Sequence, residues 1–423
     1  MTNQISAFTS LEELKTAAAR LDSEDKLESY GALFDLPDDC IYLDGNSLGV
    51  LPVSAKKRAK EVVEQQWGRD LISSWNTHNW IDLPIIVGEK IAKIVGAAPS
   101  QTLCCDSISV NLFKLLCGAL NMRPNRKVVL SQQDNFPTDL YMVQGVESLL
   151  SSQRCMLRTV DSNNLEASLN EEVAVLLLTQ VNYKTGYIHN MAKLTKLAHE
   201  KGILVIWDLA HSAGVLDLKL DAWEVDFAVG CTYKYLNGGP GAPGFVYVAQ
   251  RHLAQFKQPL SGWMGHSNPF QFSPNYQSNK NISQCLTGTP AIISMSILDA
   301  ALDVFNNLSM LQVVEKSQAL TEFFIAGLTA LELDTDLICI SPLEPELRGS
   351  QVAVTHPNAF AICQALIKRN VVADFRAPNV LRFGFAPLYI GFSDVVRALE
   401  SLKQIIANKV YLNPEFEVKS KVT

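Results

Sequence analysis

Chemically capable side chains stand just beyond short apolar runs in the middle of the sequence. Asp208 and His211 directly follow the run 203–207, and Lys234 follows the run 225–231. An aspartate after a strand is often only a helix cap, and a lysine there is usually a solvated charge, so each residue alone says little. In open α/β sheets, however, ligands bind beyond the carboxyl ends of the strands. The pattern therefore predicts that these three side chains meet at one edge of a sheet.

Two further segments supply groups that could hold a flat, phosphorylated cofactor. Ser107 and Ser109 precede a helix-like stretch, where hydroxyls and free backbone N–H groups can bind a phosphate. Phe136 offers an aromatic surface that could stack over a ring. Pyridoxal phosphate needs these features, and it also needs a lysine for a Schiff base and a carboxylate that keeps its pyridine nitrogen protonated. Lys234 and Asp208 suit these two roles, so the sequence predicts a pyridoxal phosphate enzyme.

The elements that must position these residues form an alternating pattern. Apolar runs recur between residues 100 and 250, and helix-like segments at 111–120 and 191–201 separate several of them. The runs are 127–131, 173–181, 203–208, 225–231 and 244–249. Strands that alternate with helices predict an α/β fold with a mixed, mostly parallel sheet covered on both faces. The last two runs are joined by a glycine-rich connection without room for a helix, which favours an antiparallel pair.

The two ends of the chain have a different pattern. Residues 1–40 and 53–98 are typical of helical segments. After residue 290 two helical stretches, 291–307 and 310–331, come first, and then follow short strands at 338–341, 351–355, 371–375 and 380–385 and a last helix at 393–408. We expect an N-terminal helical segment (1–44) that packs with the small domain, a large cofactor-binding domain (45–290) and a smaller C-terminal α+β domain (291–423).

Composition and charge argue against several other classes of protein. Of the 423 residues, 48% are hydrophobic and 19% are charged, which is typical of a globular protein and not of a disordered or fibrous one. The net charge of −7 and the lack of a basic stripe argue against nucleic-acid binding. No apolar run reaches the ~18 residues of a membrane span, and the first residues do not resemble a secretory signal. Nine cysteines without CxxC spacing predict neither disulfides nor a metal site, so we expect a cytoplasmic location.

Longer motifs closely resemble the kynureninase family. They are Gly45–Gly49, Ser109–Leu112, Phe136–Asp139, Asp208–His211, Trp223–Ala228, Tyr233–Asn237, Gly262–His266, Asp374–Pro378 and Leu381–Arg382. The resemblance implies the fold-type I pyridoxal phosphate fold of the aspartate aminotransferases and a homodimer with shared active sites. It also implies hydrolysis of L-kynurenine, and of its 3-hydroxy form, to anthranilate or 3-hydroxyanthranilate and L-alanine. This reaction belongs to tryptophan catabolism and pyridine nucleotide biosynthesis.

The resemblance further implies roles for the residues that face the cofactor. Lys234 matches the Schiff-base lysine that carries the Cα proton, and Asp208 matches the partner of the pyridinium nitrogen, with His211 beside it. Tyr233 matches a phosphate-bound tyrosine that donates a proton; a phosphate would raise its pKa and a cation would lower it, and the sequence leaves both open. The other positions matched to the cofactor are Ile108 and Ser109 at the phosphate, Phe136 stacking on the ring, Asp139 and Thr179.

Other matched positions face the substrate or a second copy of the chain. Arg382 matches the arginine that holds the substrate α-carboxylate, and Ser47 lines the site. Arg376 is an alternative to Arg382 for this carboxylate contact, because residues an even number apart on one strand point to the same face. The intervening Pro378 argues against an unbroken strand. Trp263 and Thr289 match positions that reach across the dimer interface. Some family members carry Thr at the position of Ser109 and Asn at that of Thr289, and both changes keep a hydrogen-bonding group.

Several alternatives stand beside this interpretation. His266 is either a neighbour of the substrate ring or a structural histidine after a tight turn. A cysteine desulfurase or an aminotransferase would share Asp208 and Lys234, but a desulfurase needs a mobile loop cysteine late in the chain, whereas Cys339 and Cys363 lie in strand-like and helical stretches. A cofactor-free scaffold protein would have no need for both the lysine and the aspartate. The loop 73–80 does not align firmly with the family, so its histidine receives no role.

Overall fold

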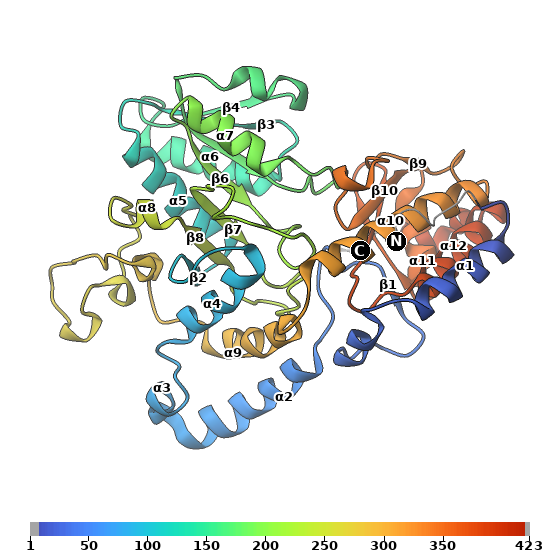
Figure 1. The fold of residues 1–423 in the computed structure, drawn as a ribbon, viewed down its shortest axis with the longest axis horizontal. Helices are drawn as coiled ribbons and strands as arrows, with labels where there is room; N and C mark the ends of the chain where they lie inside the picture. Colours follow the sequence, from blue (N-terminus) through green and yellow to red (C-terminus); the bar gives the residue numbers. More distant parts are fainter. Residues whose placement is uncertain (1–7, 419–423) are drawn as a thin grey trace.

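A computed structural model of the chain describes residues 8–418, so the first seven residues of the N-terminal segment and the last five of the C-terminal domain lie outside the described part. A seven-stranded sheet organises the larger part of the chain (Figure 1). Its strand order is β2-β8-β7-β6-β5-β3-β4. The strands are β2 (Thr102–Cys104), β3 (Val128–Gln132), β4 (Met156–Val160), β5 (Val173–Thr179), β6 (Leu204–Asp208), β7 (Phe227–Gly230) and β8 (Phe245–Val248).

The predicted topology of this sheet is confirmed. Strands β4, β3, β5, β6 and β7 pair in parallel, and β8 pairs antiparallel with β7, as the short glycine-rich connection requires. The sequence analysis did not find β2, which has three residues, or β4, an edge strand whose side chains are all half-buried and lack a strong apolar pattern. Both strands lie at the edges of the sheet.

Helices cover both faces of the sheet, and alternate strand residues pack against them. Val205 and Trp207 of β6 belong to a core shared with α4 (Leu83–Val95) and α7 (Met191–Glu200). Leu204 and Ile206 of the same strand belong to a second core shared with α5 (Ile108–Met122) and α6 (Pro137–Leu150). Because side chains of a strand alternate between the two faces, a fully apolar strand implies two covered faces, as predicted.

The C-terminal part of the chain builds a second, antiparallel sheet with its own core. The strand order is β12-β13-β10-β9. The strands are β9 (Ile338–Cys339), β10 (Gln351–Thr355), β12 (Asp374–Arg376) and β13 (Val380–Gly384), and the helices are α10 (Met310–Ala330), α11 (Ala359–Ile367) and α12 (Phe392–Ala407). The predicted strand 371–375 is split, because β11 (Val371–Val372) leaves this sheet and pairs in parallel with β1 (Ile41–Tyr42). Helix α11 contains Cys363, which the sequence analysis placed in a helical stretch.

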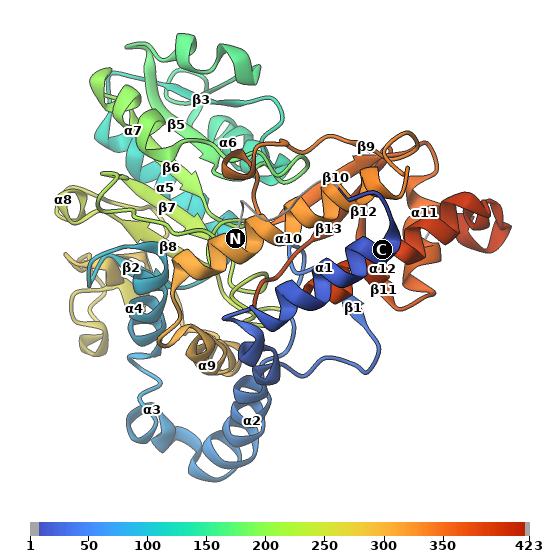
Figure 2. The ribbon, with the colours of Figure 1, turned by 45° about the vertical axis from the view of Figure 1, so that its right-hand side comes forward.

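The N-terminal helix α1 (Leu11–Ser23) lies against α12 (Figure 2). Its buried face consists of Leu14, Ala18 and Leu21, at helical spacing, and it joins the core of the small sheet. The Asp22 carboxylate accepts hydrogen bonds from the Phe392 and Ser393 backbone N–H groups at 2.6 and 2.9 Å, which satisfies the first turn of α12. We propose that segment 1–44 packs with the small domain on the strength of these contacts.

The stretch between β1 and α4 is helical but broken. It contains α2 (Val53–Glu61), a π-helical segment (Val62–Asp70) and the short α3 (Ser74–Thr77), and α2 and α3 extend away from the body of the molecule (Figure 1). A short helix, α8 (Gln250–Leu253), follows β8. Helix α9 (Ile292–Ala301) contributes Met295 and Leu298 to the core of the large sheet. The proposed boundary at residue 291 therefore falls before a helix that packs with the large domain.

Within residues 8–418, no single helix has the length and apolar composition to cross a membrane. One pair, Ile292–Phe305 with Met310–Ala330, has them jointly but bends by 84° between its two halves.

Candidate active site

A cavity of about 190 Å³ lies at the carboxyl ends of the central strands. Thr179 ends β5 and Asp208 ends β6, and these two residues are register partners across the parallel pair. The cavity gathers nine residues that the sequence analysis selected: Ile108, Ser109, Phe136, Asp139, Thr179, Asp208, His211, Tyr233 and Lys234. Five separate segments of the chain therefore converge on one site, as the strand-end pattern predicts.

Lys234 and His211 form a close polar pair in this cavity. Lys234 Nζ lies 2.9 Å from His211 Nε2. Burial and the Lys234 charge hold the pKa of His211 well below its ordinary value, so the imidazole is neutral and Nε2 accepts the hydrogen bond from the ammonium group. The proton of the ring is then on Nδ1, which is buried and has no hydrogen-bond partner within residues 8–418.

Two buried carboxyl groups face the same space. Burial raises the pKa of Asp208 to about 6, although a backbone hydrogen bond from Ala210 N–H and the nearby Lys234 oppose this shift. Asp139 is wholly buried, and neither of its carboxylate oxygens has a partner within the described part of the chain. Burial and Asp208 raise the pKa of Asp139 well above its ordinary value. Buried carboxyl groups without partners are costly, which points to a ligand that completes them.

The N-terminus of α5 forms the floor of the cavity on one side. Ser107 is the N-cap, and its hydroxyl accepts a hydrogen bond from the Val110 backbone N–H. A Cβ atom at Gly244 would lie 3.1 Å from the Ile108 backbone nitrogen, so a larger residue would crowd this end. The first turn of a 15-residue helix offers free N–H groups and a positive dipole end, which is a suitable place for a phosphate.

Tyr233 and Phe136 also line the cavity. Burial, the Cys231 thiol and Asp208 raise the pKa of Tyr233, so its hydroxyl keeps a proton and can donate it. Phe136 caps α6, and its ring meets that of Tyr183 edge to face at 5.3 Å. The sequence analysis missed Tyr183, which lies in the loop after β5, and Cys231, which stands directly after β7. The strand-end rule that selected Asp208 could have found both.

A smaller adjoining cavity of about 150 Å³ contains the arginines. It shares Phe136, Tyr183, His211, Tyr233 and Lys234 with the first cavity and adds Asn46, Ser47, Arg376 and Arg382. Arg376 ends β12 and Arg382 lies in β13, so the two belong to neighbouring antiparallel strands and not to one unbroken strand. The argument from Pro378 against a continuous strand is confirmed.

Arg382 is almost completely buried and is held from several sides. Its Nε donates to Asp374 Oδ1 at 2.7 Å, its Nη2 donates to Asp374 Oδ2, and its Nη1 donates to the Tyr183 carbonyl oxygen. Arg376 is more exposed and also meets Asp374 Oδ2, at 2.9 Å. The sequence analysis did not select Asp374, because an ion pair across a hairpin leaves no motif of its own.

Comparison with known proteins identifies the family. Residues 313–402 match the model of the kynureninase C-terminal domain, and residues 148–249 match that of aminotransferase class I and II. The kynureninase of Burkholderia mallei (strain SAVP1) is 44% identical over 410 residues, which are 96% of this chain and 99% of that protein. The kynureninase of Pseudomonas fluorescens is 43% identical over 408 residues, 95% and 98% of the two chains. The chain belongs to the kynureninase family.

Solved structures of lower identity share the fold of this kynureninase family member. A cysteine desulfurase from Thermococcus onnurineus NA1 matches with a TM-score of 0.77 and 17% identity over 90% of this chain and 98% of its own. A C-DES mutant with glycine covalently linked to its PLP cofactor matches with a TM-score of 0.73 and 17% identity, over 86% and 97% of the two chains. The fold is therefore the fold-type I pyridoxal phosphate fold, as predicted.

Three residues that the family resemblance selected lie outside this cavity in their own chain. Trp263 is partly exposed, with Phe270 and Phe272 packed against its ring at 5.7 and 6.3 Å. Thr289 lines a separate cavity of about 320 Å³. His266 is buried, its Nδ1 accepts the Asn268 backbone N–H at 2.9 Å, and its Nε2 lies 3.3 Å from the Asn275 carbonyl oxygen. None of these three residues lines the cavity around Lys234.

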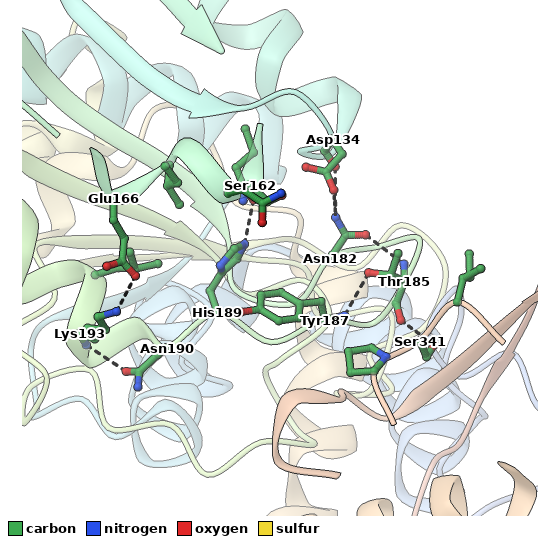
Figure 3. Close-up of a pocket in the computed structure, with 16 residues that line it drawn as sticks. Asp134, Ser162, Glu166, Asn182, Thr185, Tyr187, His189, Asn190, Lys193 and Ser341 are labelled. Atoms are coloured by element: carbon green, nitrogen blue, oxygen red, sulfur yellow. Dashed lines mark hydrogen bonds and ion pairs between the residues drawn. The ribbon is translucent and has the colours of Figure 1, made fainter. Parts of the chain in front are cut away.

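A separate, larger cavity of about 700 Å³ has different chemistry (Figure 3). The lysine that lines it, Lys193, is paired with Glu166 at 2.6 Å. Burial lowers the pKa of His189 to about 4, and its Nε2 lies 2.8 Å from Gln132 Oε1. This cavity lacks the Lys234, Asp208 and Asp139 groups, so volume alone does not identify the reaction site in this family member.

Proposed function

We propose that this chain hydrolyses L-kynurenine to anthranilate and L-alanine with pyridoxal phosphate as cofactor, and that it accepts the 3-hydroxy form in the same way. The observation that carries the proposal is the Lys234, His211, Asp208 and Asp139 cluster. It occurs in a chain that is 44% identical to a kynureninase over 96% of its length. The proposal assigns the enzyme to the hydrolases acting on carbon–carbon bonds in ketones, and to tryptophan catabolism and pyridine nucleotide biosynthesis.

The residues of the site suit this cofactor. The orphaned carboxyl oxygens of Asp139 and the buried Asp208 carboxyl need hydrogen-bond donors, which a protonated pyridine ring bears. Ile108 and Ser109 in the first turn of α5 would hold the phosphate, and Phe136 would cover the ring. When bound, pyridoxal phosphate withdraws electrons from the amino acid attached to it, so that the Cα proton becomes acidic and the Cβ–Cγ bond can break.

The side chains of the chain itself then carry protons. Lys234 would hold the cofactor through its aldehyde, and its amine would move the proton at the substrate Cα. His211, neutral and 2.9 Å from Lys234 Nζ, orients this amine. Tyr233 keeps its proton and would donate it to Cβ as a positioned general acid. Thr179 and Ser47 line the walls on either side.

The substrate carboxylate is assigned to the arginine cavity. A guanidinium group binds a carboxylate with two parallel hydrogen bonds, and Arg382 lies in the cavity that shares Lys234 with the cofactor site. Arg376 lies beside it on the neighbouring strand. We assign the main contact to Arg382, which the family resemblance favours, with Arg376 as the alternative.

We further propose a homodimer with shared sites. Trp263, Phe270 and Phe272 form an exposed aromatic cluster, which is unusual on a monomer surface. Trp263, Thr289 and His266 would reach the site of a second copy. We also propose a cytoplasmic location, because all nine cysteines are free. We propose that the protein binds neither nucleic acid nor a membrane.

The test is direct. Purified protein supplied with pyridoxal phosphate is incubated with L-kynurenine, and anthranilate is detected by its fluorescence; L-cysteine, with sulfide detection, tests the desulfurase alternative. Cys363 is buried in α11 and Cys339 lies in β9, so no sulfide is expected. Sulfide release without anthranilate would overturn the proposal.

A further inference from the structure

Four charged side chains meet at the arginine end of the active site. Asp374 accepts hydrogen bonds from Arg382 through both carboxylate oxygens and an ion pair from Arg376. Asp44, from the N-terminal segment just after β1, is the fourth, and it interacts electrostatically with the other three. Two guanidinium charges are thus balanced by two carboxyl groups before any substrate arrives.

The two carboxyl groups are not equivalent. Asp374 pairs with both arginines and also accepts a hydrogen bond from the Ser47 hydroxyl at 2.7 Å. Asp44 has no arginine hydrogen bond, and its Oδ1 is buried without a partner within residues 8–418. The backbone of Asp44 is fixed, because it bridges to Gly384 and its carbonyl oxygen accepts the Ser47 backbone N–H at 2.9 Å. The backbone of Asp44 therefore keeps its place beside Gly384 and β13.

A substrate α-carboxylate would be a third negative group beside two positive ones. Buried charges that lack a partner are costly, and a carboxyl group in that position loses its charge by taking up a proton. Asp374 is committed to two arginines, so Asp44 is the group that can become neutral. We infer that binding of the substrate α-carboxylate is coupled to uptake of one proton by Asp44. This inference rests on the proposed function, since it needs an amino-acid substrate at Arg382.

The other groups around Asp44 cannot supply the missing positive charge. Tyr42, Tyr235, Tyr389 and Cys363 interact with it, and burial raises the pKa of each, so all four are neutral at physiological pH. His211, which faces the arginines from the other side, is neutral as well. Burial and Asp374 raise the pKa of Asp44 to about 7, which agrees with a group that changes charge near neutral pH.

The experiment measures protons taken up on binding. The holoenzyme is titrated with L-alanine by calorimetry at about pH 8 in buffers of different ionisation enthalpy, and Asp44→Asn is compared with wild type, so that protons exchanged elsewhere cancel. We expect wild type to take up about one proton more than Asp44→Asn, because Asp44 is largely ionised before binding and protonated after it. The exposed Asp38 on the same segment gives a matched control, Asp38→Asn, which should behave as wild type.

Equal proton uptake in wild type and Asp44→Asn would overturn the inference. If Asp44→Asn does not fold, difference infrared spectroscopy of wild type decides: a new protonated carboxyl C=O band on addition of L-alanine supports the inference, and its absence contradicts it. In kinetics, KM for kynurenine should rise up to about tenfold per pH unit above the Asp44 pKa in wild type and stay flat in Asp44→Asn. Failure of the proposed function would appear separately, as no anthranilate from wild-type protein.

Discussion

Lys234 Nζ and His211 Nε2 lie 2.9 Å apart inside the large domain, with the imidazole neutral and enclosed. The histidine lone pair thus points at the amine to which we assign cofactor binding and proton transfer. Since a neutral imidazole can accept a hydrogen bond from an ammonium group but adds no charge, it orients the lysine without repelling it.

Lys234→Ala should abolish kynurenine turnover, because no other amine reaches this cavity from its lining residues. Borohydride reduction of the wild-type holoenzyme followed by peptide mapping should place the pyridoxyl label on Lys234. A label on another lysine would show that the assignment is wrong.

Asp208→Asn should leave the protein folded but lower kcat by at least about tenfold, about 1.4 kcal/mol. An amide cannot keep the pyridine nitrogen protonated, whereas its oxygen can still accept the hydrogen bond from the Ala210 backbone N–H. Asp217→Asn, which changes an exposed partner of Lys219, is the control and should retain wild-type kcat. If Asp208→Asn keeps near-wild-type turnover, Asp208 acts only as a helix cap and the assigned role is wrong.

Arg382→Lys should raise KM for kynurenine and lower kcat/KM by at least about tenfold, while the pyridoxal phosphate content stays unchanged. Lysine has a single charged group and cannot form the two parallel hydrogen bonds of a guanidinium. Arg376→Lys is the comparison, because both arginines meet Asp374. If only Arg376→Lys shows this pattern, the carboxylate contact belongs to Arg376.

Mixing inactive Lys234→Ala chains with inactive Trp263→Ala chains should restore part of the activity. In a shared-site dimer, one of the two sites of each hybrid has both intact residues. Subunit exchange is verified independently with differently tagged chains. If subunits exchange but activity does not recover, Trp263 acts in the site of its own chain or in no site.

Asp226→Asn should destabilise the fold by about 3–5 kcal/mol at neutral pH. Burial would raise the pKa of Asp226, but hydrogen bonds from His199 and His252 outweigh it and hold the pKa below its ordinary value. A lowered carboxyl pKa stabilises the folded state above about pH 4 and loses this effect as the pH falls further. Urea unfolding of wild type and Asp226→Asn should therefore differ most at neutral pH and least in acid; a difference that grows in acid would contradict this account.

Short-range patterns account for much of the fold. Apolar runs such as 173–181 and 203–208 locate buried strands, since both of their faces are covered. The edge strand β4 cannot be found from an apolar run, because its side chains are only half-buried.

Some residues of the candidate site are likewise predictable from the sequence, and others are not. Residues that follow strands, such as Asp208 and Lys234, are predictable from position alone. Asp44 and Asp374 are not, because they come from segments far apart in the sequence and acquire their chemistry only where the N-terminal segment meets β12. Their roles depend on which charges fold beside them, and no local motif records that.

The anchoring of α12 by the Asp22 carboxylate has a further consequence. The same N-terminal segment runs from that anchor through β1 to Asp44 and Ser47, so the substrate end of the site is strapped to the small domain by its own chain. Asp22→Ala should weaken the packing of this segment and lower turnover, while the large sheet stays folded. Hydrogen exchange of the amides in residues 41–47 should then become faster in Asp22→Ala as turnover falls. Activity would therefore require that this segment is packed against the small domain.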